Sequence, residues 1–350
     1  MKASKRVDDA ANKVIEAAFN LEQSRALRRM QSAIDEQRRH IAALTLENER
    51  HERDKQILLG LNDRANVRNW SKPPARKRGE ATAIAISSDW HVEEVVTPEK
   101  VNNLNEHNPK IAERRIATYA ARTARMIDRY RKDAIIDEGV LILGGDMISG
   151  FLHADQVETN AMSPIRACEF AEELAEGAIR YLLRESGCKK WSVVCLTGNH
   201  DRTTDKLRCA TRNDNSYLTL IYSHLRKRMA GVRNLEWQIA DGEFAYFDVY
   251  NRKVRALHGD AIKYQGGLAG LAAPANRMIA DWNRTIRADY TIFGHHHRFN
   301  WNDANGWICN GSTMGTNCYG LKFGAAPPCQ ALAIIDENRG LTDVCKIYVE

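Results

Sequence analysis

The stretch Trp191–Asp201 reads WSVVCLTGNHD, and it decides the fold of this 350-residue chain. Its first half, residues 191–196, is an apolar run of the kind that forms a buried β-strand. The strand leads directly into the motif Gly198-Asn-His-Asp201, whose oxygen and imidazole donors suit divalent metal ions. We therefore expect an α/β fold in which a strand delivers metal ligands at its carboxyl end.

Four further motifs of the same kind occur along the chain. They are Asp89-Trp-His91, Gly145-Asp146, His258-Gly-Asp260 and Gly294-His-His-His297. Each follows a short apolar run that reads as a strand. One such motif would be weak evidence, but five in order, each at a strand end, predict a hydrolytic site with two metal ions.

The spacing within the motifs indicates how the ligands divide. Asp89 and His91 are two residues apart, so on an extended backbone their side chains point to the same side and can hold one ion. Asp146 can bridge two cations, because a carboxylate has two oxygens. Asn199 offers a neutral carbonyl oxygen, which limits the negative charge at the site.

His258 and His295 are the expected ligands of the second ion. His258 stands alone as a ligand candidate, and Asp260 beside it is the alternative. In the last motif, His297 shares a face with His295 by two-residue alternation, whereas His296 points the other way. This parity predicts that His297, not His296, is the remaining ligand.

These motifs resemble the pattern of the calcineurin-like metallophosphoesterases, and the resemblance covers about residues 82–337. It implies a four-layer α/β/β/α sandwich with the metal ions at the carboxyl ends of the strands. One metal ion would then be held by Asp89, His91, Asp146 and His297. The other would be held by Asp146, Asn199, His258 and His295.

The resemblance also implies roles in catalysis. His200 matches the general acid that protonates the leaving oxygen, and Asp201 would orient it. The nucleophile would be a hydroxide held between the two metal ions. The metal is expected to be Mn²⁺, although Fe, Zn or Ni also suit such ligands.

Two motif variants bear on the substrate. Protein Ser/Thr phosphatases carry Gly-Asp-x-x-Asp-Arg-Gly at the second motif and end the third in Glu, and neither feature is present here. The segments 198–206, 215–218 and 310–312 look like phage and prophage phosphoesterases grouped with SbcD-type DNA nucleases. Arg202, Lys206 and His153 are candidate substrate-binding residues, with ordinary surface side chains as the alternative.

The first 80 residues differ in composition from the rest. They hold 18 Lys and Arg against 12 Asp and Glu, which accounts for the whole formal charge of +6. We expect a helical segment over 1–68, a basic Pro-containing linker over 69–80 and the catalytic domain over 81–350. The basic segment is expected to tether nucleic acid, or else to be a solvated helix.

A heptad pattern begins at Leu27 and runs through Met30, Ile34, Ile41 and Leu44, and then becomes polar. It is compatible with a dimerising coiled coil or with packing on the catalytic domain. From residue 81, strands and helices alternate and then give way to a strand-rich half. This order predicts two packed sheets flanked by helices.

The bulk properties exclude other classes. No apolar stretch approaches the roughly 20 residues of a membrane span, and no signal peptide is evident, so a cytoplasmic protein is expected. The eight cysteines form no Cys-x-x-Cys pair and read as free thiols. The sequence thus predicts a Mn²⁺-dependent phosphodiesterase or nuclease acting on DNA. The alternatives are an enzyme for small nucleotides or phosphoproteins and a non-catalytic, metal-stabilised scaffold.

Overall fold

The computed structural model describes the chain except for residues 1, 63–77, 153 and 267–269. The chain divides into two compact units, residues 1–75 and 76–350. The boundary between them falls within the expected linker over 69–80, most of which lies outside the described residues. The predicted division at 68 and 80 therefore stays a prediction.

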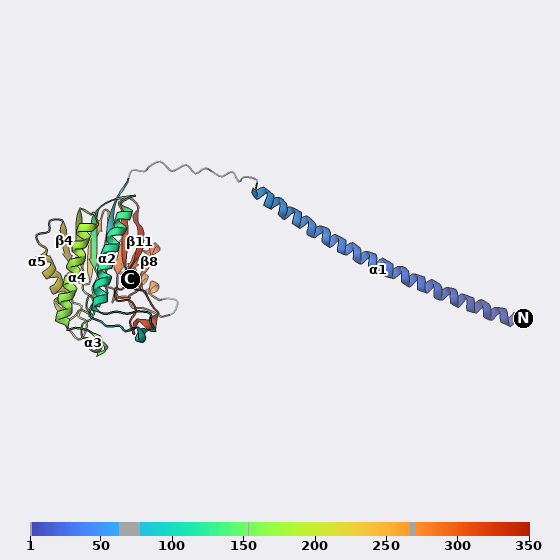
Figure 1. Cartoon of the computed structure of the whole chain (residues 1–350), viewed down its shortest axis with the longest axis horizontal. Helices are drawn as coiled ribbons and strands as arrows, with labels where there is room; N and C mark the ends of the chain where they lie inside the picture. Colours follow the sequence, from blue (N-terminus) through green and yellow to red (C-terminus); the bar gives the residue numbers. More distant parts are fainter. Residues whose placement is uncertain (1, 63–77, 153, 267–269) are drawn as a thin grey trace. The chain divides into compact units, whose positions relative to one another are not determined.

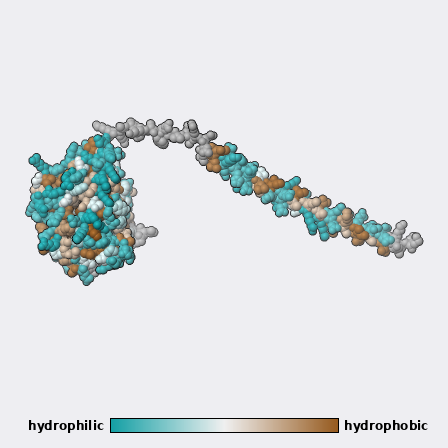
Figure 2. Space-filling model, viewed as in Figure 1, coloured by the Kyte–Doolittle hydropathy of each residue, from teal (hydrophilic) through white to brown (hydrophobic). Residues whose placement is uncertain are grey.

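The first unit contains one long helix, α1 (Lys2–Asn62), as the absence of Pro and the abundance of Ala, Leu, Glu and Arg lead one to expect. Its described side chains are exposed along its whole length, apolar ones included. Figure 2 shows these apolar residues recurring in brown along the helix. None of the described residues of this unit covers them.

The second unit is built on two β-sheets with helices on their outer faces (Figure 1). The six-stranded sheet contains β1 (Glu80–Ser87), β2 (Ile135–Leu143), β3 (Lys190–Cys195), β4 (Leu235–Ile239), β10 (Cys329–Asp336) and β11 (Gly340–Tyr348). The five-stranded sheet contains β5 (Phe244–Val249), β6 (Arg252–Leu257), β7 (Tyr290–Phe293), β8 (Asn300–Asn302) and β9 (Trp307–Cys309). The strand orders are β11-β10-β1-β2-β3-β4 and β5-β6-β7-β9-β8.

Helices complete the four layers. The helices of this unit are α2 (Pro109–Tyr130), α3 (Ala154–Thr159), α4 (Pro164–Glu185), α5 (Tyr217–Arg228) and α6 (Ala272–Asn283). Short 3-10 turns lie at Pro98–Val101, Asn213–Asn215, Asp303–Asn305 and Gly320–Phe323. In Figure 1, α2 and α4 cross the outer face of the six-stranded sheet, and one apolar core lies between this sheet and α2, α4 and α5. A second core lies between the sheets, and a third lies under α6. The predicted α/β/β/α sandwich is confirmed.

Parallel strands β1, β2 and β3 are central to the six-stranded sheet, so their carboxyl ends lie side by side. Ser87 pairs with Leu143, and Leu143 pairs with Cys195. The loops that carry the first three motifs therefore leave the sheet at the same edge. The sheet register thus brings residues about 110 positions apart in sequence into one site.

Local signals explain where the predicted boundaries differ. The alternation of strands and helices expected from residue 81 does not fix where each helix begins, and α4 starts at Pro164 because Ser163 caps it and proline suits a first helical position. The residues before it form the separate helix α3, which the apolar pattern did not reveal. Strand β8 was also missed, since three residues carry too little periodicity.

Candidate metal centre

Two groups of ligand atoms face each other across this edge of the sandwich. The first contains Asp89, His91 and His297, and the second contains Asp146, His258 and His295. Within each group the ligand atoms lie within 4.8 Å of one another. The structure thus brings together six of the seven expected metal ligands in two groups, and Asn199 lies beside the second.

The metal-ligand atoms of the second group lie so close together that a cation or a proton is needed between them. Nδ1 of His258 donates to the Gly144 carbonyl at 2.8 Å, so Nε2 of the neutral ring carries a lone pair. That Nε2 lies 3.0 Å from Asp146 Oδ2 and 3.1 Å from Asn199 Oδ1. Three lone-pair atoms at these distances repel one another unless a positive charge lies between them, so the group fits a divalent ion.

The first group shows the same arrangement. His91 Nε2 lies 3.3 Å from His297 Nε2, which in turn lies 3.3 Å from Asp89 Oδ1. The other ring nitrogen of His91 lies 2.9 Å from the Ser149 hydroxyl, so its orientation is supported from outside the site. Hence both groups fit one cation each, and together they fit a dinuclear metal centre.

The close packing of these groups shifts their pKa values in the metal-free site. Burial alone would lower the pKa of His258, but the Asp146 carboxylate outweighs it and raises the pKa to about 10. Burial would raise the pKa of Asp146, yet His258 and His200 hold it well below its usual range. Burial and the neighbouring His258 lower the pKa of His295 to about 3. The second group therefore holds one proton on His258 at neutral pH.

Backbone strain is concentrated at the ligands. Asp89, His91, Asp146, His295 and His297 all have positive φ, between 46° and 67°. This left-handed conformation is uncommon for residues other than glycine and is often found at functional sites. The ligands therefore project from sharp turns and not from regular strands.

These turns correct the physical basis of the parity argument. His297 does lie in the first group while His296 does not, but residues 294–297 form a bend in which two-residue alternation does not apply. His297 reaches the first group through its left-handed backbone. The His296 ring is half-buried and lies edge-on to the His295 ring at 5.0 Å, and its Nε2 has no hydrogen-bond partner among the described residues.

Two glycines are required by the close approach of the motifs. A Cβ on Gly198 would overlap the carboxylate and the backbone nitrogen of Asp146. A Cβ on Gly294 would lie 2.5 Å from both Asp89 Oδ2 and Ser88 Oγ. The glycines beside the ligands thus let two loops come together around each carboxylate.

His200 lies at the rim of the site. Its backbone nitrogen donates to Asp146 Oδ1 at 2.8 Å, and its ring contacts the His91 ring edge-on at 5.1 Å. The expected role of Asp201 in orienting the His200 ring stays a prediction. The Asp201 carboxylate is fully buried and accepts from the backbone nitrogen of Gly198 at 3.0 Å. Asp201 therefore shapes the turn of the motif, and burial raises its pKa to about 7.

The three predicted substrate-binding residues differ in what the structure shows of them. The guanidinium of Arg202 donates to the backbone carbonyls of Asn199, Thr204 and Asp205, so it braces its own loop. Lys206 is exposed on the same loop. His153 lies outside the described residues. The phosphate-binding role of these residues stays a prediction.

Several supporting residues were missed by sequence reasoning. Ser88 Oγ and Asn310 link the Asp89 carboxylate to Gln330, and all of these are buried. On the other side, Glu94 accepts from the Ser149 hydroxyl that supports His91. Such polar side chains act through the ligands, and no short motif identifies them.

Comparisons with known proteins found low similarity, among solved structures only. No protein-family model matches the sequence, and no curated protein shows significant similarity. Among solved structures, Vps29 from Entamoeba histolytica with Zn²⁺ is 10% identical, covering 76% of this chain and 99% of that one, with a TM-score of 0.31. The hypothetical protein PH1004 from Pyrococcus horikoshii OT3 is 10% identical, covering 77% and 89%, with a TM-score of 0.37. Sulfate thiohydrolase SoxB from Thermus thermophilus is 9% identical, covering 80% and 58%, with a TM-score of 0.31. Similarity at this level concerns the fold only.

Proposed function

We propose that this chain is a metal-dependent phosphoesterase that hydrolyses phosphodiester bonds in DNA. The observation that carries the proposal is the pair of facing ligand groups, Asp89/His91/His297 and Asp146/His258/His295, with His200 at their rim. Two divalent cations bound there would supply Lewis acids for the phosphoryl oxygens and activate a water as the nucleophile. Mn²⁺ is the proposed metal, with Fe, Zn or Ni also compatible with the donor set.

The protein's own residues would hold the ester and handle the proton. The Asp146 carboxylate lies in the second group and also binds the His200 backbone, so it couples the position of His200 to that of the ligands. His200 is only part-buried, so a substrate can approach it from solvent. We assign it the role of the acid that protonates the leaving oxygen.

DNA is the proposed substrate because the excess positive charge lies in one segment. Residues 1–80 carry 18 Lys and Arg against 12 Asp and Glu, whereas the rest of the chain is neutral. Basic segments bind phosphate backbones without regard to sequence, and salt weakens that binding steeply. The sequence resemblance to SbcD-type nucleases points the same way.

The test compares substrates and variants. With Mn²⁺, the protein should degrade fluorescent DNA, and His200→Ala should abolish cleavage while the bound metal remains. His224→Ala serves as the matched control, because His224 pairs with Glu172 on the outer helices. If DNA stays intact while bis-p-nitrophenyl phosphate is cleaved, an enzyme for small nucleotides or phosphoproteins is supported instead. If neither is cleaved with metal bound, the scaffold alternative is supported.

A second copy of the chain is the proposed partner of α1. Leu27, Ile34, Ile41 and Leu44 are exposed on one heptad seam, and burying them requires another surface. Ile41→Lys should convert a dimer into a monomer in sedimentation experiments. Leu46→Lys is the control, since Leu46 is equally apolar and exposed but lies off the seam. Equal effects of the two substitutions would exclude this seam as the dimer interface.

A further inference from the structure

Among the described residues, the shortest printed side-chain contact to the His200 ring comes from a helix with no motif in it. Gln156 lies on the six-residue helix α3, and its Nε2 is 2.7 Å from His200 Nδ1. Gln156 is 8% exposed, so this amide is held away from water. A buried amide at this distance from a ring nitrogen is a specific polar contact and not a chance approach.

We propose that Gln156 is a positioning residue that selects the Nε2–H tautomer of the neutral His200 ring, so that Nε2–H can donate a hydrogen bond to the leaving oxygen as negative charge develops on it. This inference rests on the proposed function for its catalytic consequence. The Gln156–His200 contact itself stands without that function. Gln156 acts through His200 and is not itself expected to touch the substrate.

The choice of tautomer follows from the donor. An amide N–H can only donate, so Nδ1 must accept, and the proton of a neutral ring is then on Nε2. The carbonyl of Ser149 lies 3.3 Å from the same Nδ1 and would accept only from a protonated nitrogen. The amide contact is 0.6 Å shorter than the carbonyl contact, and it therefore decides the neutral form.

Helix α3 is itself anchored to the metal-site loops. The Asn160 side chain, just after the helix, donates to the Gly150 carbonyl at 2.6 Å. Val95 donates to the Thr159 carbonyl at 3.1 Å, and Ala161 donates to the Glu93 carbonyl at 2.7 Å. Gly150 also packs so closely under His200 that a Cβ there would lie 2.6 Å from the His200 carbonyl oxygen. The amide of Gln156 is thus fixed relative to the loops that hold His91 and Asp146.

A glutamine and a carboxylate at position 156 would favour different tautomers of the His200 ring. A carboxylate would accept from Nδ1–H and favour the opposite tautomer, whereas the amide donates and carries no charge. Gln156→Glu therefore reverses the hydrogen bond while keeping the size of the side chain. Gln156→Ala removes the hydrogen bond altogether.

The first experiment measures the tautomer directly. Full-length protein labelled with ¹⁵N-histidine, without metal and at a pH where the ring is neutral, is examined by long-range ¹H–¹⁵N correlation. The His200 signals are identified by their loss in His200→Ala. We expect an unprotonated Nδ1 in the wild type and in the control Val157→Ala, whose side chain is exposed on the same helix. Gln156→Glu should show a protonated Nδ1, and Gln156→Ala a mixture.

Two outcomes of this experiment overturn the proposal. One is a wild type in which Nδ1 carries the proton. The other is a Gln156→Glu protein whose tautomer matches that of Val157→Ala. Neither outcome depends on phosphoesterase activity, so a failure of the proposed function would not be mistaken for a failure of this contact.

The second experiment measures the catalytic consequence with thymidine 5′-phosphate aryl esters. Gln156→Ala should lower kcat roughly 10- to 100-fold for a phenol leaving group, with KM unchanged. The loss should be smaller for p-nitrophenol, which needs less protonation as it leaves. Equal losses for both leaving groups, or a change confined to KM, would contradict the positioning role.

Discussion

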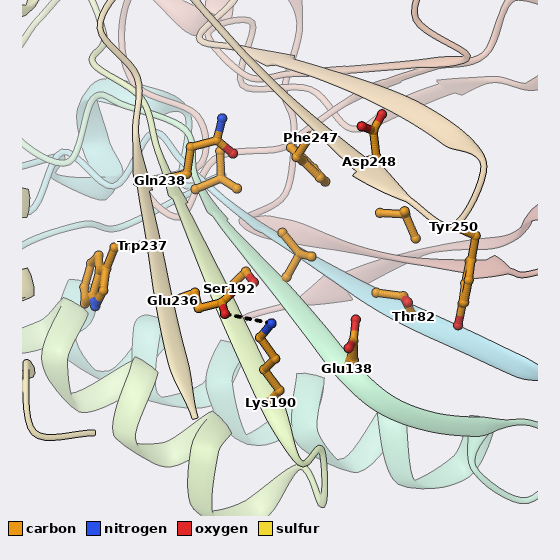
Figure 3. A pocket seen from close by; sticks show the side chains of 13 residues that line it. Thr82, Glu138, Lys190, Ser192, Glu236, Trp237, Gln238, Phe247, Asp248 and Tyr250 are labelled. Atoms are coloured by element: carbon orange, nitrogen blue, oxygen red, sulfur yellow. Dashed lines mark ion pairs between the residues drawn. The ribbon is translucent and has the colours of Figure 1, made fainter. Parts of the chain in front are cut away.

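The two ends of strands β1, β2 and β3 carry polar side chains in opposite environments. At the carboxyl end, Asp89 and Asp146 are fully buried, and each lies in a ligand group with two histidines. Toward the amino ends of β2, β3 and the neighbouring β4, Glu138, Lys190 and Glu236 are partly or fully exposed beside an open cavity of about 340 Å³ (Figure 3). Buried charges are costly unless paired or bound to metal, whereas exposed ones are not. The comparison teaches that the carboxyl end is built for a ligand and that the amino end need not be.

The largest effect is expected from Asp146→Asn. The substitution keeps the shape but removes the charge that opposes His258, so the second group should lose its metal ion. Activity should fall at least about 1,000-fold, because even one lost hydrogen-bond donor in an active site can cost that much. Metal content by mass spectrometry and kcat check this prediction. Normal metal content with unchanged kcat would contradict the conclusion that the carboxyl end of the strands is built to bind a ligand.

A substitution in the apolar core between the two sheets should act on stability and not on chemistry. Ile142 is buried between the sheets, and Ile142→Ala should lower the free energy of unfolding by about 2–5 kcal/mol. Ile135→Ala is the control on the same strand, since Ile135 is 41% exposed. Urea unfolding of both variants measures the difference. An equal loss at Ile135 would argue against the inter-sheet core as its source.

Metal affinity should depend on pH in a direction set by His258. Burial opposes protonation, but Asp146 raises the pKa of His258 to about 10, so a proton must leave before this ring can bind metal. The apparent affinity of the second group should therefore rise with pH, by up to about tenfold per unit below pH 10. Titration calorimetry in buffers of different ionisation enthalpy measures both the affinity and the released proton. A flat affinity between pH 7 and 9 would show that His258 is unprotonated in the metal-free chain.

The carboxyl end was also the part most visible in the sequence. Short apolar runs ending in Asp, Asn and His identified the strands and their ligands, because strand register brings these ends together. What the sequence could not show are contacts made by residues without a motif. Gln156 reaches His200 from a helix too short to have periodicity, and Arg212 is buried in an ion pair with Asp260. Arg202 likewise turned out to brace backbone carbonyls of its loop.

The smallest effect is expected at the amino end. Lys190 Nζ lies 2.8 Å from Glu236 Oε1, with the two side chains 41% and 63% exposed (Figure 3). Water screens such a pair, so Lys190→Met should change the free energy of unfolding by less than about 1 kcal/mol. Activity on DNA should stay the same, because Lys190 begins β3 and the ligands lie beyond the carboxyl end of that strand. Glu236→Gln, which removes the other partner, should behave alike. A tenfold loss of activity in either variant would show that the polar residues of this cavity also bind a ligand. The difference in burial between the two ends would then no longer distinguish the end that binds a ligand from the end that does not.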